Sequence, residues 1–306
     1  MTLSLPLLKP RPADARPVWE EPPGAVGKVA KAVVVAVVCA VMILPFLTVL
    51  STSLASREQI TEAGGFVLFP TDPTLQAYTT ILSGGVVTRA VLVSVGVTVV
   101  GTTLSLATTI AFAYALSKRG VPGAKAILMM VLFTLLFAPG MIPMYVLVKE
   151  LGLLDSYWAL ILPGMISAFN LVVLRAFYMN IPEELYQAAR IDGAGDWRIL
   201  TRIVLPLSKG VTAVVGLFYA VTYWNAFFNA MLYLNDSGKW PIQVVLRTYV
   251  VQNKQLTADQ LGLQHMPPQQ SIAMAVVMLA LVPILLLFPF LQKYFTKGVL
   301  TGAVKG

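Results

Sequence analysis

The sequence predicts an all-α membrane protein with six transmembrane helices. Of the 306 residues, 57% are hydrophobic and 12% are charged, and the mean hydropathy is +0.78. This composition is typical of a multi-span membrane protein rather than of a soluble domain. The apolar residues gather in uncharged runs, each long enough for the roughly 20 residues that a spanning helix needs. Since lipid cannot satisfy backbone hydrogen bonds, such runs are expected to be helices.

The predicted spans follow one another along the chain as residues 32–56, 90–117, 126–148, 156–174, 210–235 and about 272–291. Prolines inside them are expected to kink several helices, namely Pro45, Pro139, Pro143, Pro163 and Pro283. Gly96 and Gly101 in the second span indicate close packing between helices. The single cysteine, Cys39, lies in the first span and is expected to be an inert thiol.

The distribution of Lys and Arg predicts how the spans are oriented. With the N-terminus in the cytoplasm, 16 of the 22 basic residues fall on the cytoplasmic side and 6 on the other. Because cytoplasmic loops carry the excess of basic residues, we expect both termini and the connection between the fourth and fifth spans to be cytoplasmic. The net charge of +8 is then an orientation signal, and no nucleic-acid partner is predicted.

The segments outside the spans complete the predicted organisation. We expect a flexible cytoplasmic tail, a six-helix transmembrane domain and a cytoplasmic C-terminal tail, at residues 1–27, 28–292 and 293–306. Two external segments, 57–89 and 236–270, are longer than most loops without a function. The second is predicted to contain a short helix at about 244–252, and it holds the only histidine, His265.

The longest charged stretch, residues 180–209, is predicted to form two short helices. Pro182 suits a first helical position, and the helix dipole favours the two carboxylates of the first turn, Glu183 and Glu184. Gly193 can end this helix, and Asp196 is a plausible N-cap for a second one that runs to Ile203. The stretch is either a rigid module presented to a cytoplasmic partner or an ordinary polar connection.

This stretch resembles the "EAA" loop of the permease subunits of binding-protein-dependent ABC importers. That loop reads E-A-A, three residues, G, nine residues, I, one residue, L-P. The chain has matching residues at the same spacing, Ala188, Ala189, Gly193, Ile203, Leu205 and Pro206. It departs from the pattern at Gln187, where the family has Glu, and Glu184 could substitute one turn earlier. The wider string AARIDGAGDW…IVLPLSK is similar to the MalG-like and LplC-like carbohydrate permeases.

The resemblance implies a type I importer (MetI-like) fold in a prokaryotic cell membrane, with a peripheral first span and a cytoplasmic coupling helix. It implies a second permease, two cytoplasmic ATP-binding subunits and an extracytoplasmic solute-binding protein as partners, and a sugar or oligosaccharide as substrate. The implied ATPase-coupling residues are Glu183, Glu184, Gln187, Ala188, Ala189, Asp192, Gly193, Ile203, Leu205 and Pro206. A stiff coupling helix would make Gly193 and Ala188 close-packing positions. The C-terminal GAVKG resembles a family ending that lies near the ATPases, which implies contacts from Gly302, Val304, Lys305 and Gly306.

Motifs for catalysis are absent from the sequence. It contains no GxxxxGK[ST], HExxH or GxSxG, and the predicted spans carry no charged residue. We therefore expect no catalytic residue, metal site or cofactor in this chain, and ATP with Mg²⁺ on partner ATPase subunits.

Polar residues inside the spans are candidates for a substrate pathway. They are Asn170, Tyr223, Trp224, Asn225 and Asn229. Amides can hydrogen-bond sugar hydroxyls, and aromatic faces can stack on sugar rings. Asn225 and Asn229 are four residues apart and are expected to share one helix face. The alternative is that these residues join helices or mark the membrane interface.

Three other functions remain open at this point. One is an ABC importer permease for a different solute, such as an amino acid or phosphate. Another is a secondary transporter, which the uncharged spans and the lack of a clear inverted repeat disfavour. The third is a membrane-embedded enzyme or assembly factor, which would need a polar catalytic cluster at membrane depth.

Overall fold

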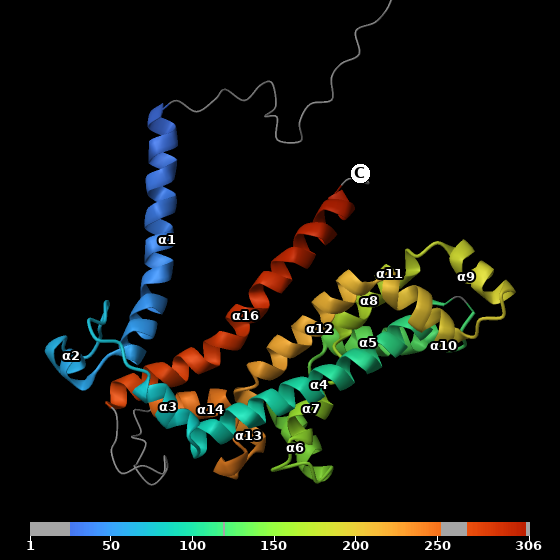
Figure 1. Ribbon diagram of the computed structural model, residues 1–306. Coiled ribbons are helices and arrows are strands. Elements are labelled where there is room, and N and C mark those ends of the chain that lie inside the picture. The colour runs from blue at the N-terminus through green and yellow to red at the C-terminus, as the bar shows by residue number, and fades with distance from the viewer. Residues whose placement is uncertain (1–24, 119, 252–267, 304–306) are drawn as a thin grey trace, which may run out of the picture. The chain divides into compact units, whose positions relative to one another are not determined.

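The computed structural model describes residues 25–118, 120–251 and 268–303, and every regular element in these ranges is a helix (Figure 1). The chain divides into two compact units, residues 1–48 and 49–306. The described part has three helices long and apolar enough to cross a membrane, judged by length and composition. They are α1 (Ala25–Leu54), α4 (Val86–Ser117) and the part of α16 (Gln269–Ala303) that runs to Pro289.

Two further segments qualify as spans only as bent pairs of helices. The first joins α7 (Trp158–Ile161) and the 3-10 helix η1 (Leu162–Gly164) to α8 (Ala168–Met179), with a bend of 49°. The second joins α10 (Asp196–Ile199), the π-helix η2 (Leu200–Val204) and α11 (Leu205–Leu207) to α12 (Lys209–Trp224), with a bend of 88°. If each pair is one span, the described ranges contain five spans.

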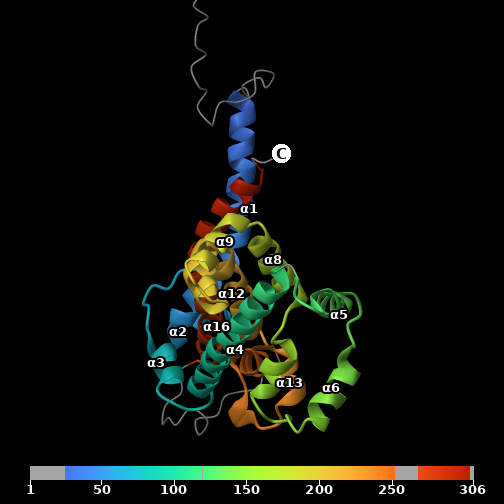
Figure 2. The same cartoon turned by 90° about the vertical axis from the view of Figure 1, so that its right-hand side faces the viewer.

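The third predicted span is interrupted. It consists of α5 (Ala124–Leu136) and α6 (Met141–Glu150), separated by a non-helical segment that contains Pro139. Pro139 supplies no amide hydrogen to a helix, and Gly140 has a φ of +80°, a backbone conformation that favours glycine. Figure 2 shows α5 and α6 beside the group formed by α4, α8 and α12.

The fifth predicted span is also interrupted, and this corrects one prediction. Helix α12 ends at Trp224, and α13 (Phe228–Tyr233) begins after a short non-helical segment. Asn225 lies at the end of α12 and Asn229 lies in α13. The prediction that these two amides share one helix face is therefore wrong, because no continuous helix joins them.

The two segments predicted to be external contain short helices. The first holds α2 (Arg57–Glu62) and α3 (Gln76–Leu82), and the second holds η3 (Ser237–Lys239). The short helix predicted at about 244–252 is present as α14 (Ile242–Leu246) and the π-helix η4 (Arg247–Val251). His265 lies outside the described residues. Helix α16 continues to Ala303, so no helix end marks the predicted start of the C-terminal tail at 293.

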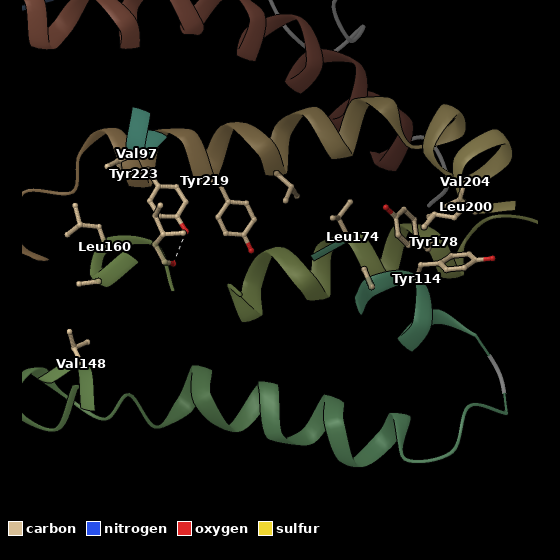
Figure 3. Packing of buried hydrophobic residues seen from close by; sticks show 14 of the residues in the cluster. Val97, Tyr114, Val148, Leu160, Leu174, Tyr178, Leu200, Val204, Tyr219 and Tyr223 are labelled. Carbon is tan, nitrogen blue, oxygen red and sulfur yellow. Dashed lines mark hydrogen bonds between the residues drawn. The ribbon is translucent and has the colours of Figure 1, made fainter. Parts of the chain in front are cut away.

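The larger core lies where α4 packs against α8 and α12 (Figures 1 and 3). Its buried residues include Val97 from α4, Leu174 from α8 and Val215 from α12. A second cluster joins α3, α4, α14 and α16, with Ile81 and Val276 fully buried. Together, the helices of the two clusters form the framework of the protein.

Candidate functional site

The first candidate site is the loop that carries the EAA-like motif, and its first helix is α9 (Glu183–Ile191). Pro182 is the N-cap rather than the first helical residue that the sequence predicted, a difference of one position. The acidic residues of the first turn are Glu183 and Glu184, as predicted. Their carboxylates complement the positive end of the helix dipole.

Gly193 ends this region by a left-handed turn. Its φ is +75°, the Gly193 amide donates to the Arg190 carbonyl at 3.0 Å, and the Ala194 amide donates to the Ala189 carbonyl at 2.9 Å. This is the Schellman arrangement, which favours glycine because a side chain strains the positive φ. A β-carbon at Gly193 would meet no atom of the described chain within 4 Å. The predicted close packing at Gly193 is therefore wrong, and the constraint there is the backbone conformation.

Helix α9 packs on the framework through Ala189 and Tyr186. Ala189 is buried, whereas Ala188 is exposed, so the predicted packing role falls one residue later than expected. Tyr186 is half-buried, and its hydroxyl donates to the Tyr178 carbonyl at the end of α8 at 3.4 Å. Burial raises the pKa of the Tyr186 hydroxyl, which stays protonated near neutral pH.

The outward face of α9 is available to a partner. Glu184, Gln187, Ala188, Ile191 and Asp192 are all exposed. Beside this face lies a pocket of about 180 Å³ that is lined by Ser117, Lys118, Tyr178, Met179, Ile181, Glu183, Tyr186, Gln187 and Arg190. Glu183 therefore lines the pocket together with Gln187, whereas the sequence singled out Glu184 as the substitute carboxylate.

Two exposed apolar side chains in this loop were not singled out from the sequence. Ile191 is 86% exposed and Trp197 is 75% exposed. A tryptophan in so open a position is unusual for a surface that faces only water, since aromatic residues are enriched in binding surfaces. The sequence could have indicated that Trp197 is exposed, because this tryptophan lies in a charged segment.

The second helix of the loop, α10, is anchored to the end of α4. Its N-cap is Gly195, so the predicted capping role of Asp196 is wrong; the Asp196 carboxylate instead forms an ion pair with Lys118. The Tyr114 hydroxyl donates to the Asp196 carbonyl at 3.2 Å, and the Lys118 Nζ lies 4.2 Å from the centroid of the Tyr114 ring. The hydrogen bond from Lys118 lowers the pKa of Asp196 below its usual value. Because Asp196 is largely exposed, the pair contributes at most about 1 kcal/mol.

The end of the motif forms the transition into α12. Ile203 and Leu205 are half-buried against the larger core, and Pro206 lies in α11 just before the bend. Ser208 is fully buried at the bend, and its hydroxyl donates to the Val204 carbonyl at 2.6 Å. Ile203 and Leu205 therefore pack against the protein interior, whereas Pro206 is exposed.

The second candidate site is the predicted pathway, and the structure places its residues in three groups. Asn170 is buried and lines a groove between α8 and α12 with Ser167, Phe169, Leu217, Phe218, Val221 and Thr222. The rings of Phe169 and Phe218 lie 6.2 Å apart in this groove. Asn225 and Asn229 are exposed, and Asn225 donates to the Val221 carbonyl at 2.9 Å.

Tyr223 and Trp224 are buried, and their polar atoms bond other helices. The Tyr223 hydroxyl lies 2.7 Å from the Ser105 hydroxyl of α4 and donates to the Ile161 carbonyl at 3.2 Å. The Trp224 indole donates to the Ala280 carbonyl of α16 at 2.9 Å. These contacts correspond to the helix-joining role that the sequence left open as the alternative.

A polar cluster joins two connections at the opposite end of the framework from α9. The Asp155 carboxylate accepts hydrogen bonds from the Asn235 and Asp236 amides, both at 3.1 Å. Lys239 donates to the Asp155 carbonyl at 2.8 Å and lies 3.4 Å from its carboxylate. The Asp236 amide and, to a smaller extent, Lys239 lower the pKa of Asp155. Asp155 has a φ of +59°, and nothing in its local sequence indicated this long-range contact.

Comparisons with known proteins place the chain among transport proteins. Residues 107–301 match the family described as "Binding-protein-dependent transport system inner membrane component". The polygalacturonan/rhamnogalacturonan transport system permease protein YtcP of Bacillus subtilis (strain 168) is 48% identical over 268 residues, which are 87% of this chain and 93% of YtcP. Protein LplC of the same organism is 46% identical over 268 residues, or 87% and 90% of the two chains.

A solved structure gives the same result for the fold. The crystal structure of a bacterial ABC transporter involved in the import of the acidic polysaccharide alginate contains a chain that superposes with a TM-score of 0.80. The two chains are 29% identical, and the match covers 88% of this chain and 96% of the other.

Proposed function

The chain belongs to the family of binding-protein-dependent transport system inner membrane components, and we propose that it is the permease subunit of an ATP-driven oligosaccharide importer. It is a membrane-spanning subunit and not itself an enzyme, so ATP and Mg²⁺ bind separate ATPase subunits. The names of YtcP and of the alginate transporter both refer to acidic polysaccharides. An acidic oligosaccharide is therefore the first substrate class to test.

The observation that supports coupling is the way in which α9 is held. Its outward face is exposed, while Ala189 is buried, the Tyr186 hydroxyl bonds the end of α8 and the Lys118–Asp196 pair attaches the loop to the end of α4. A push on the outward face of α9 would therefore move α4 and α8. This face is formed by Glu184, Gln187, Ala188, Ile191 and Asp192. We assign ATPase contact to this face, to Glu183 in the adjoining pocket and to Trp197.

The remaining motif residues support this face from behind. The chain passes from the coupling loop into α12 through the π-helix η2 and the short helix α11. This connection is held by three motif residues, Ile203, Leu205 and Pro206. The C-terminal residues Gly302, Val304, Lys305 and Gly306 would add a second contact to the ATPases. Residues 304–306 of this group lie outside the described ranges.

The pathway is assigned to the groove around Asn170. The Asn170 carboxamide can hydrogen-bond sugar hydroxyls, and the Phe169 and Phe218 rings can contact a sugar face. The exposed amides of Asn225 and Asn229 would extend the pathway beyond α12. The second permease subunit would supply the opposite wall.

The membrane arrangement follows from the charge distribution. We place both termini and α9 in the cytoplasm, and the segments 57–89 and 236–270 on the side of the solute-binding protein. In this arrangement α5 and α6 cross together as a broken span, which gives six crossings in total. Backbone breaks are tolerated in a membrane where they face protein or a cavity.

Reconstitution with the partner permease, the ATPases and the binding protein tests the proposal. We expect ATP-dependent uptake of acidic oligosaccharides that is abolished by vanadate and by omission of the binding protein. Neutral oligosaccharides, amino acids and phosphate serve as competing substrates in the same vesicles. Uptake of only a non-sugar solute would overturn the substrate assignment, and vanadate-insensitive uptake would overturn the ATP-driven mechanism.

A further inference from the structure

The bent span made of α7, η1 and α8 contains a break whose backbone groups lack their normal helical partners. Met165 donates its amide to the Leu162 carbonyl three residues back, so the Ile161 carbonyl is not used by the amide that a continuing α-helix would offer. At the other end of the break, Ser167 is the N-cap of α8, where backbone amides also lack intrahelical acceptors. At membrane depth such groups need partners, because lipid supplies none.

Two tyrosines of α12 supply these partners. The Tyr223 hydroxyl donates to the Ile161 carbonyl at 3.2 Å, and the Tyr219 hydroxyl accepts from the Ser167 amide at 3.0 Å. The tyrosines are four residues apart on one helix, so one turn of α12 faces both ends of the break. Figure 3 shows both side chains pointing from α12 toward α7 and α8.

Two hydroxyls of α4 hold the tyrosines from the other side. Ser105 lies 2.7 Å from the Tyr223 hydroxyl, and Thr109 lies 2.7 Å from the Tyr219 hydroxyl. Ser105 and Thr109 are also four residues apart, and both are fully buried. Each tyrosine is therefore fixed by a hydroxyl on one side and by a backbone group of the break on the other.

The break leads directly into the proposed pathway. Ser167, Phe169 and Asn170 follow it and form one wall of the groove between α8 and α12. We infer that Tyr219 and Tyr223 are positioning residues for transport, because their hydroxyls hold the two ends of this break and so set the position of the groove wall. The inference rests on the proposed function for its link to transport. The geometric part, that the two tyrosines hold the ends of the break, does not depend on the substrate.

The geometric part is tested by chemical labelling of the break. Ile166 lies inside the break and is 38% exposed, so Ile166→Cys in a Cys39→Ser background gives a reporter thiol in the assembled importer. We expect Tyr219→Phe and Tyr223→Phe to raise its rate of modification by a water-soluble maleimide at least threefold. The matched control is Tyr78→Phe, which removes a hydroxyl pair of equal length, 2.7 Å to Ser53, away from the break.

The transport part is tested with the same tyrosine substitutions in the native-cysteine complex. We expect fewer sugar molecules imported per ATP hydrolysed, with the melting temperature and subunit co-purification close to those of the parent complex. A purely structural role would instead lower the melting temperature in proportion to the lost activity. Should a tyrosine variant fail to assemble, Ser105→Ala and Thr109→Ala keep both tyrosines and release their orientation, and they should raise labelling in the same way.

The possible results distinguish whether the tyrosines hold the break from whether this affects transport. Labelling rates in the tyrosine and hydroxyl variants that equal those of the parent and of Tyr78→Phe would overturn the inference. Faster labelling with an unchanged transport ratio would overturn the positioning role. If the parent complex imports no oligosaccharide, the proposed function fails, and the labelling rates still decide whether the tyrosines hold the break.

Discussion

Gly101 of α4 lies against the ring of Tyr223 of α12, so closely that a β-carbon at Gly101 would come within 2.9 Å of three ring carbons. Gly96, one turn and a half earlier on the same helix, has open space where its β-carbon would stand. The sequence indicated close packing at both glycines. Within the described chain, the prediction is confirmed at Gly101 and not at Gly96. The contact lets α4 and α12 approach closely enough for Ser105 to reach the Tyr223 hydroxyl.

Gly101→Ala should destabilise the protein by about 1–3 kcal/mol, because the added methyl group overpacks a rigid aromatic contact. Gly96→Ala on the same helix should be neutral or slightly stabilising, since alanine favours helix and meets no neighbour. Thermal unfolding of the two purified variants in detergent checks the difference. Equal melting temperatures for both variants would contradict the packing argument.

Gly193→Ala should reduce ATP-coupled uptake, because the positive φ of the turn after α9 costs a side-chain residue about 1 kcal/mol. Gly193→Asn should be milder, since asparagine tolerates this conformation better. The matched control is Gly195→Ala, whose φ of −71° is ordinary for alanine. Uptake and ATPase stimulation are measured in proteoliposomes, and equal losses at positions 193 and 195 would rule out the backbone explanation.

Gln187→Glu should tighten the complex with the ATPase subunits by about 1.4-fold to fivefold. The new carboxylate restores the charge that the family carries at this position, and an exposed ion pair contributes roughly 0.2–1 kcal/mol. The pair should weaken as salt is raised, because screening acts on exposed charges. Titration of the ATPase into detergent-solubilised permease at low and high salt gives both quantities. Weaker binding by the Glu variant would show that Gln187 faces an acidic partner surface.

Trp197→Ala should weaken ATPase association by at least tenfold and leave the melting temperature of the isolated permease unchanged. The side chain is 75% exposed, so its removal opens no cavity, whereas buried tryptophans are frequent energetic centres of interfaces. Phe69→Ala in the segment 57–89 is the control, since Phe69 is 78% exposed and lies far along the chain from the motif. Similar losses of association in both variants would indicate a non-specific effect of removing surface aromatics.

Asp155→Asn should lower the melting temperature at pH 7, and the difference from the parent should disappear in acid. The folded protein holds the pKa of Asp155 below its ordinary value of 3.8, through the Asp236 amide and Lys239. A carboxyl group with a depressed folded pKa stabilises above its unfolded pKa, and this contribution is lost as the pH falls through the folded pKa. Melting curves between pH 7 and pH 3 follow the difference. If the difference in melting temperature between the parent and Asp155→Asn stays constant across this range, the charge of Asp155 does not contribute to that difference.

The helical membrane class, the positions of the apolar runs and the identity of the loop at 180–209 could all be predicted from the sequence. These features follow from local chemistry, since lipid selects uncharged helical runs and glycine is the residue that most readily adopts the positive φ of a helix C-terminus, as Gly193 does. The points at which the runs break, and the polar side chains that are buried between helices, became known only from the folded structure. Ile161 and Ser167 depend on tyrosines more than 50 positions away, and Lys118 meets Asp196 across 78 positions. Such pairings arise only when helices pack, so no local pattern around either partner contains them.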